Sequence, residues 1–214
     1  FVHAEGDRTL LGSLTLKGDG TVSNLAAASP GASGIVRATW TASQGRATDP
    51  WKFTFDAKGE RLATGMAELD RLLGAAPRLR AAGTYAGTDI QVTSSNLDGA
   101  AGSASASGLI RRDGTLGLAV NWSAKGPFRA GPVEIAGNVS GTGQVGGSLL
   151  APRADLAADV DAIDLPMMPL RAAHVVLSFV KTANDYDGQI SVAAESQFGP
   201  ARGASTFAFR TGGV

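Results

Sequence analysis

The residues with the most specific spacing are the glycines of residues 141–146, which match the dinucleotide-binding pattern G-x-G-x-x-G. That pattern binds a pyrophosphate only where a strand ends and a helix begins, because the helix N-terminus holds the anion. Here Gly147, Ser148 and Pro152 follow the pattern, and such residues disfavour a helix. Alternating apolar and acidic residues then begin at Ala154, as in a β-strand. We therefore interpret these glycines as strand and turn positions and expect no bound cofactor.

Four aspartates, Asp155, Asp159, Asp161 and Asp164, follow this segment and could be considered as cation ligands. The first three share one face of the expected strand, about 13 and 7 Å apart at ~3.3 Å per residue. Calcium needs its oxygen ligands within about 2.5 Å of the ion, which one straight strand cannot provide. We interpret these aspartates as acids that keep an outer face solvated, and we predict no metal site.

The sequence also lacks the usual combinations of catalytic residues. The only histidines, His3 and His174, are far apart in the sequence, and neither has a neighbouring histidine with which to share a metal. The sequence contains no G-x-S-x-G, H-E-x-x-H or phosphate-binding loop motif. It has no cysteine, which excludes disulfides and thiol catalysis. We therefore expect a protein that is not an enzyme.

Composition narrows the remaining classes of function. Nineteen basic and nineteen acidic residues cancel, which argues against a nucleic-acid partner. Charged residues make up 18% of the chain, and the 29 glycines suit a thin extended sheet better than a dense core. No run of roughly 18 apolar residues is present to span a membrane. Because the chain starts at Phe1 without an initiator methionine, we interpret it as a segment of a longer protein, whose other parts could carry a membrane anchor.

Short alternating segments of apolar and polar residues recur along the whole chain and predict an antiparallel, all-β structure. Asp19-Gly20 and Asp113-Gly114 are predicted hairpin turns, because both dipeptides tolerate positive φ angles. The residues on the apolar line of these segments are Leu14, Leu16, Phe53, Phe55, Leu118, Val120, Val133, Ile135, Leu156, Val160, Val175, Leu177, Phe179, Ile190, Val192, Phe207 and Phe209.

One segment has helical rather than strand periodicity. Its helical face consists of Leu62, Met66, Leu69, Leu73 and Ala76. We predict a short amphipathic helix near residues 64–74, capped by Thr64 and ended by Gly74, which would cover part of the apolar surface. We treat residues 1–214 as one continuous segment. Its possible subdivisions are N-terminal strands at 1–60, a helix insertion at 61–82 and the main strands at 83–214.

The segment after the glycines carries a family resemblance. Gly147-Ser148-Leu149 leads into Pro152-Arg153, Leu156 and then Asp164-Leu165-Pro166, and a fainter copy spans residues 72–85. This arrangement resembles the repeats of the TamB (translocation and assembly module) family and of the wider AsmA-like group of β-groove envelope proteins. The resemblance implies a long antiparallel sheet curled into a U-shaped trough, the β-taco, with an apolar inner face.

The resemblance also implies a function. Such proteins are anchored in the bacterial inner membrane, cross the periplasm, and conduct phospholipid acyl chains toward the outer membrane. They also assist outer-membrane protein assembly with an outer-membrane TamA-like partner. The apolar line given above would then be the lining of a lipid groove.

Alternation alone leaves other structures open, because the same apolar line would also fill a closed sandwich or barrel. A secreted β-solenoid or adhesin-like structural module is one alternative. A closed β-sandwich that binds carbohydrate is another, and Trp40, Trp51 and Trp122 are its candidates for an aromatic platform.

Overall fold

The computed structural model describes residues 1–9, 12–27, 31–130, 133–165, 168–182 and 185–209, and the side chains of 128–130, 133 and 209 are not described. The chain forms two compact units, residues 1–112 and residues 113–214. Both units consist of antiparallel strands, and nearly every strand pairs with its neighbours in the sequence. The predicted fold class, mainly β and antiparallel with one short helix, is confirmed.

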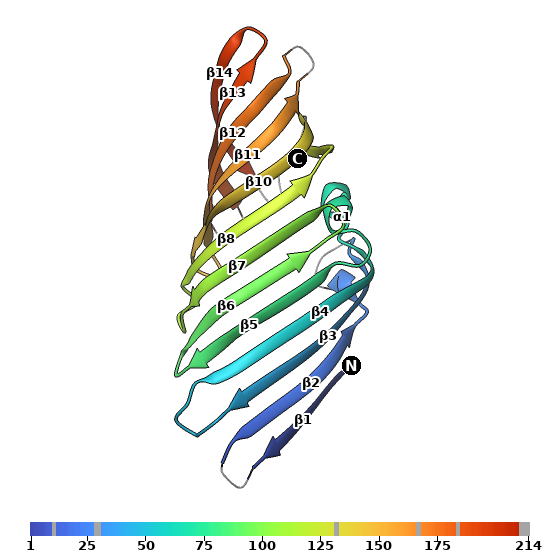
Figure 1. Cartoon of the computed structure of the whole chain (residues 1–214), viewed down its shortest axis with the longest axis vertical. Coiled ribbons are helices and arrows are strands. Elements are labelled where there is room, and N and C mark those ends of the chain that lie inside the picture. The colour runs from blue at the N-terminus through green and yellow to red at the C-terminus, as the bar shows by residue number, and fades with distance from the viewer. Residues whose placement is uncertain (10–11, 28–30, 131–132, 166–167, 183–184, 210–214) are drawn as a thin grey trace. The chain divides into compact units, whose positions relative to one another are not determined.

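The first unit is a sheet whose strands follow one another in sequence order (Figure 1). Its strands are β1 (Val2–Arg8), β2 (Leu14–Val22), β3 (Ser33–Gln44), β4 (Trp51–Ala63), β5 (Arg78–Ala86), β6 (Asp89–Asp98) and β7 (Gly102–Ile110). A short 3-10 helix, η1 (Leu25–Ala27), lies between β2 and β3. The first and last strands, β1 and β7, do not pair with each other, so the sheet of this unit is open.

The second unit is built in the same way. Its strands are β8 (Leu116–Lys125), β9 (Phe128–Ala130), β10 (Val133–Gly147), β11 (Pro152–Asp164), β12 (Leu170–Thr182), β13 (Asp185–Ser196) and β14 (Gly199–Phe209). The short β9 pairs with the start of β10, and β8 pairs with the rest of that strand. The outermost strands, β8 and β14, do not pair with each other.

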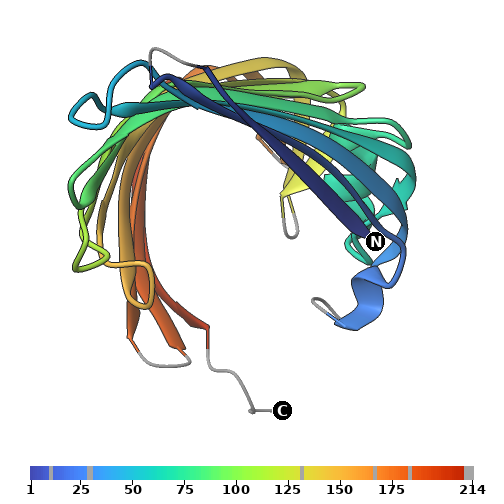
Figure 2. The same cartoon turned by 90° about the horizontal axis from the view of Figure 1, so that it is seen from below.

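The long strands of each unit are bowed along their length (Figure 2), so each sheet is curled and remains open. Within each unit the described strands belong to one sheet, and no second sheet closes over it. The expectation of a curled, open antiparallel sheet is therefore confirmed for each unit, and neither unit is a closed sandwich or barrel.

The glycine-rich segment at residues 141–146 lies within β10, as the strand interpretation predicted. The hairpin turn predicted at Asp19-Gly20 is wrong, because both residues continue β2 and pair with Thr39 and Ala38 of β3. The turn predicted at Asp113-Gly114 is confirmed and precedes β8. Both dipeptides tolerate a turn, and cross-strand pairing determines which of them forms one.

The helix α1 (Ala67–Leu73) is shorter than predicted. Leu62 belongs to β4, and Thr64 is not the N-cap, because Met66 occupies that position without a side-chain hydrogen bond. Gly74 ends the helix with a φ of 69°, as predicted. The carbonyl groups of Leu72 and Leu73 accept hydrogen bonds from the turn between β6 and β7, so α1 lies against that turn. Among the described residues no helix has the length and apolar character needed to cross a bilayer.

The buried core is thin. Ten apolar residues are buried in the described structure, and most of them are small: Ala57, Ala124, Val139, Ala154, Ala158, Val160, Ile163, Leu170, Ala173 and Ala194. A single curled sheet buries little side-chain volume, because no second sheet among the described strands packs against its side chains. Most of the larger apolar side chains are consequently half-buried.

Candidate functional site

The strand register of the first unit gathers the predicted apolar positions on one face. Leu16 of β2 lies opposite Ala42 of β3, which lies opposite Phe53 of β4. Because paired residues of antiparallel strands point to the same side, this face can be followed from β2 to β7. We call it the N-terminal apolar face: Leu14, Leu16, Val36, Trp40, Trp51, Phe53, Phe55, Leu79, Tyr85, Ile90, Val92, Leu97 and Ile110.

The second unit has an equivalent face. Leu156 of β11 lies opposite Leu177 of β12, which lies opposite Ile190 of β13. We call the set the C-terminal apolar face: Leu118, Val120, Trp122, Val139, Val145, Leu156, Val160, Val175, Leu177, Phe179, Ile190, Val192 and Phe207. Most of its large side chains are half-buried, whereas Val139 and Val160 are buried.

Three of the predicted lining residues are not assigned to either face. Ile135 pairs with the buried Ile163, beyond the register shift of β10 that follows Ala136. The side chains of Val133 and Phe209 lie outside the described part of the structure. The prediction also omitted Trp40, Trp51 and Trp122, although these residues continue the same alternation on β3, β4 and β8.

Charged residues are segregated from the two apolar faces. In the registered pairs of β2 to β7, all charged residues lie on the face opposite the N-terminal apolar face. In the second unit Asp155, Asp159 and Arg202 likewise lie opposite the C-terminal apolar face. Lys181 lies at the end of that apolar face, with its Nζ 5.9 Å from the centre of the Tyr186 ring. The central rows of both apolar faces are free of charge.

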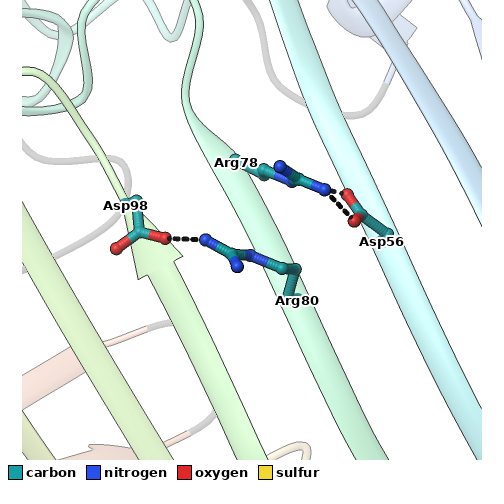
Figure 3. Close-up of polar contacts among 4 residues, drawn as sticks. All are labelled: Asp56, Arg78, Arg80 and Asp98. Atoms are coloured by element: carbon teal, nitrogen blue, oxygen red, sulfur yellow. Dashed lines mark hydrogen bonds and ion pairs between the residues drawn. The ribbon is translucent and has the colours of Figure 1, made fainter.

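The polar face of the first unit carries cross-strand ion pairs (Figure 3). Arg78 of β5 donates to both carboxylate oxygens of Asp56 on β4, and its Nε lies 3.0 Å from Oδ1. Arg80 bonds Asp98 of β6 at 2.8 Å. The hydrogen bond from Arg78 lowers the pKa of Asp56, and the same bond raises the pKa of Arg78.

A third ion pair ties β3 to β4 on the same polar face. The Nε of Arg37 lies 2.8 Å from a carboxylate oxygen of Glu60. This hydrogen bond lowers the pKa of Glu60. With the pairs of Figure 3, ion pairs therefore connect the polar face of four successive strands, β3 to β6.

Three of the four aspartates considered for a cation site have separate partners. Asp155 bonds Arg153 at 3.0 Å, and Asp159 lies 2.8 Å from Nδ1 of His174. Asp161 accepts a hydrogen bond of 2.8 Å from the backbone N–H of Asn138. In the described ranges, no three histidine, aspartate or glutamate side chains come together in a way that could hold a metal ion.

Two of the dinucleotide-like glycines, Gly141 and Gly143, face the apolar side of the sheet. Gly141 lies opposite Trp122, and a Cβ built at Gly141 would come closer than 3.0 Å to the indole ring. Gly143 lies opposite Leu156 and would meet its side chain in the same way. The indole Nε1–H of Trp122 is buried without a hydrogen-bond partner, so packing over Gly141 holds the ring. Gly141 and Gly143 are therefore required for close packing of these side chains against β10.

Comparison with protein-family models, curated proteins and solved structures finds no match to this chain.

Proposed function

We propose that the chain is a non-enzymatic lipid-carrying segment, whose two apolar faces hold the acyl chains of phospholipids. The observation that carries this proposal is the half-exposed apolar surface on one side of each open sheet, whose central rows carry no charged residue. A soluble domain normally covers such a surface, and a large exposed apolar patch marks a binding surface. Hydrocarbon would gain about 25 cal/mol per Å² of apolar surface removed from water, without directional contacts.

The sequence resemblance to the TamB family supports the cellular setting of this proposal. By that resemblance the chain is a periplasmic segment of an inner-membrane-anchored protein that bridges toward the outer membrane. It would assist phospholipid transport, outer-membrane protein assembly with a TamA-like partner, or both. Open sheets with an apolar side whose central rows carry no charge are the geometry that such a conduit requires.

A photo-crosslinking experiment tests the proposal. A photoreactive amino acid is placed at Leu177 on the C-terminal apolar face, and at Phe53 on the N-terminal one. The control position is Asp159, whose side chain is 79% exposed on the polar face. After incubation with phosphatidylglycerol vesicles, mass spectrometry should find acyl adducts at Leu177 and Phe53 and few at Asp159. Equal labelling at all three positions, or no labelling in folded protein, would overturn the proposal.

Charge insertion gives an independent test in the full-length protein. Leu177→Arg or Val192→Arg places a cation in the apolar rows, where no acyl chain can solvate it. Both substitutions should block lipid passage, whereas Asp159→Arg should leave it largely intact. If Asp159→Arg were as harmful as the two apolar-face substitutions, the assignment of faces would be wrong.

A further inference from the structure

Large apolar side chains on the two faces lie over glycines of the neighbouring strand. In each case the two residues are directly paired in the register, and a Cβ on the glycine would come closer than 3.0 Å to the large side chain. The pairs are Leu16 over Gly6, Trp40 over Gly18, Phe53 over Gly83, Trp122 over Gly141, Leu156 over Gly143 and Phe207 over Gly188.

The glycine opposite each large side chain determines how far that side chain rises above the sheet. The ring of Trp122 occupies the space that a Cβ of Gly141 would need, so it leans across β10 close to the backbone. Trp40 leans across β2 over Gly18 in the same way. A large residue opposite an alanine or valine could not take this position and would have to stand out from the sheet.

Four of these large side chains are aromatic, and they occur in both units. Aromatic residues provide a large apolar area, and the glycines allow that area to be presented nearly flush with the sheet. A flexible hydrocarbon chain gains most from such a low and continuous surface, because its contact area is not interrupted by ridges.

We infer that these glycines determine which lipids the faces accept: by holding large side chains against the sheet, they let long, unbranched acyl chains lie on it. This inference rests on the proposed lipid-carrying function and adds the glycine positions that control how closely an acyl chain fits against the apolar faces. It predicts that one added methyl group, although apolar, weakens lipid binding wherever it displaces a ring.

Gly141→Ala and Gly18→Ala are the sharpest variants, because tryptophan atoms are the nearest neighbours of a Cβ at both positions. Gly203→Ala is the matched control. Gly203 lies opposite Val192, on the C-terminal apolar face, and a Cβ there would meet nothing within 4 Å. All three variants add the same methyl group to an apolar face, but the control displaces no ring.

The probe is a fluorescent palmitoyl lipid titrated into the folded proteins. Gly141→Ala and Gly18→Ala should weaken binding by about fivefold or more, and Gly203→Ala should stay within about twofold of the parent protein, differences of roughly 1 kcal/mol and less than half of that. ¹⁹F NMR of fluorotryptophan-labelled protein without lipid should show one shifted tryptophan signal in Gly141→Ala and none in Gly203→Ala.

A second-site variant separates the ring from a general loss of structure. In Gly141→Ala combined with Trp122→Val, the displaced ring is removed, and palmitoyl binding should return toward the parent value. If the parent protein binds the lipid and Gly141→Ala binds it equally well, the inference is overturned while the proposed function stands. If the parent protein binds no lipid, the proposed function is overturned, and the inference with it.

Discussion

Arg78 is bonded to Asp56 of β4, although Asp98 of β6 lies directly opposite it in the register. Arg80 shows the reverse arrangement: it bonds Asp98 of β6, although Asp56 of β4 lies directly opposite it. Each arginine of β5 therefore reaches diagonally to a different neighbouring strand (Figure 3). The two pairs tie β4, β5 and β6 together on the polar face.

This network predicts a specific loss of stability in acid. Arg78 lowers the pKa of Asp56, so the ionised carboxylate stabilises the fold at pH values above the ordinary aspartate pKa. That contribution is lost as the pH falls below about 4 and through the lowered pKa of the folded state. In urea unfolding, Asp56→Asn should lower the midpoint at pH 7, and its difference from the parent protein should shrink toward pH 2.

Arg78→Gln provides the matched test of this mechanism. Removing the arginine should reproduce the loss caused by Asp56→Asn at pH 7, and the double variant should lose little more than either single variant. Strictly additive losses would show that Asp56 is stabilised by something other than Arg78. A pH-independent effect of Asp56→Asn would also contradict the role of its ionised form.

The packing of Trp40 over Gly18 makes a prediction about stability that does not involve lipid. Gly18→Ala forces the indole from its position, and overpacking of this kind typically costs about 1–3 kcal/mol. Gly203→Ala should change the free energy of unfolding by less than about 1 kcal/mol, in the stabilising direction, because alanine restricts the unfolded chain. Urea unfolding measures both. Equal effects would mean that Trp40 accommodates the methyl group without cost.

The sequence was sufficient to predict the fold class and the apolar faces, because alternation with a period of two reports directly on which side of a strand a residue lies. Leu156, Leu177 and Ile190 were assigned from three separate segments, and the register brings them into one row. Trp40, Trp51 and Trp122 were not among the predicted lining residues. Their positions in the alternation already carried the correct signal.

Other features depend on pairing between distant segments and could not be predicted locally. Asp19-Gly20 has the composition of a turn, but its pairing with β3 keeps it in a strand. The pairing of glycines with large side chains follows from the register alone, because no residue near Gly141 in the sequence indicates that Trp122 will lie opposite it. The register shift after Ala136 similarly separates Ile135 from the alternation that the sequence predicts.

The short helix α1 is predicted to depend on one carboxylate. The Asp70 side chain accepts a hydrogen bond from the backbone N–H of Thr64, which fixes the connection between β4 and α1 and lowers the pKa of Asp70. A helix of seven residues is not stable by itself. Asp70→Ala should therefore speed amide hydrogen exchange in residues 64–74. Unchanged exchange in this segment would contradict the role of Asp70.

Alanine substitutions of two valines of the C-terminal apolar face should distinguish residues that pack within the protein from residues that contact lipid. Val160 is only 4% exposed, whereas Val192, which lies opposite Val175, is half-buried. Val160→Ala should lower the free energy of unfolding by about 1–2 kcal/mol, at ~0.8 kcal/mol per buried methylene-sized group, and leave palmitoyl binding unchanged. Val192→Ala should cost less stability and weaken binding, because its side chain faces the open side of the sheet. Paired urea unfolding and lipid titration measure both effects. The reverse result, with binding lost in Val160→Ala and kept in Val192→Ala, would show that lipid reaches a different part of the sheet.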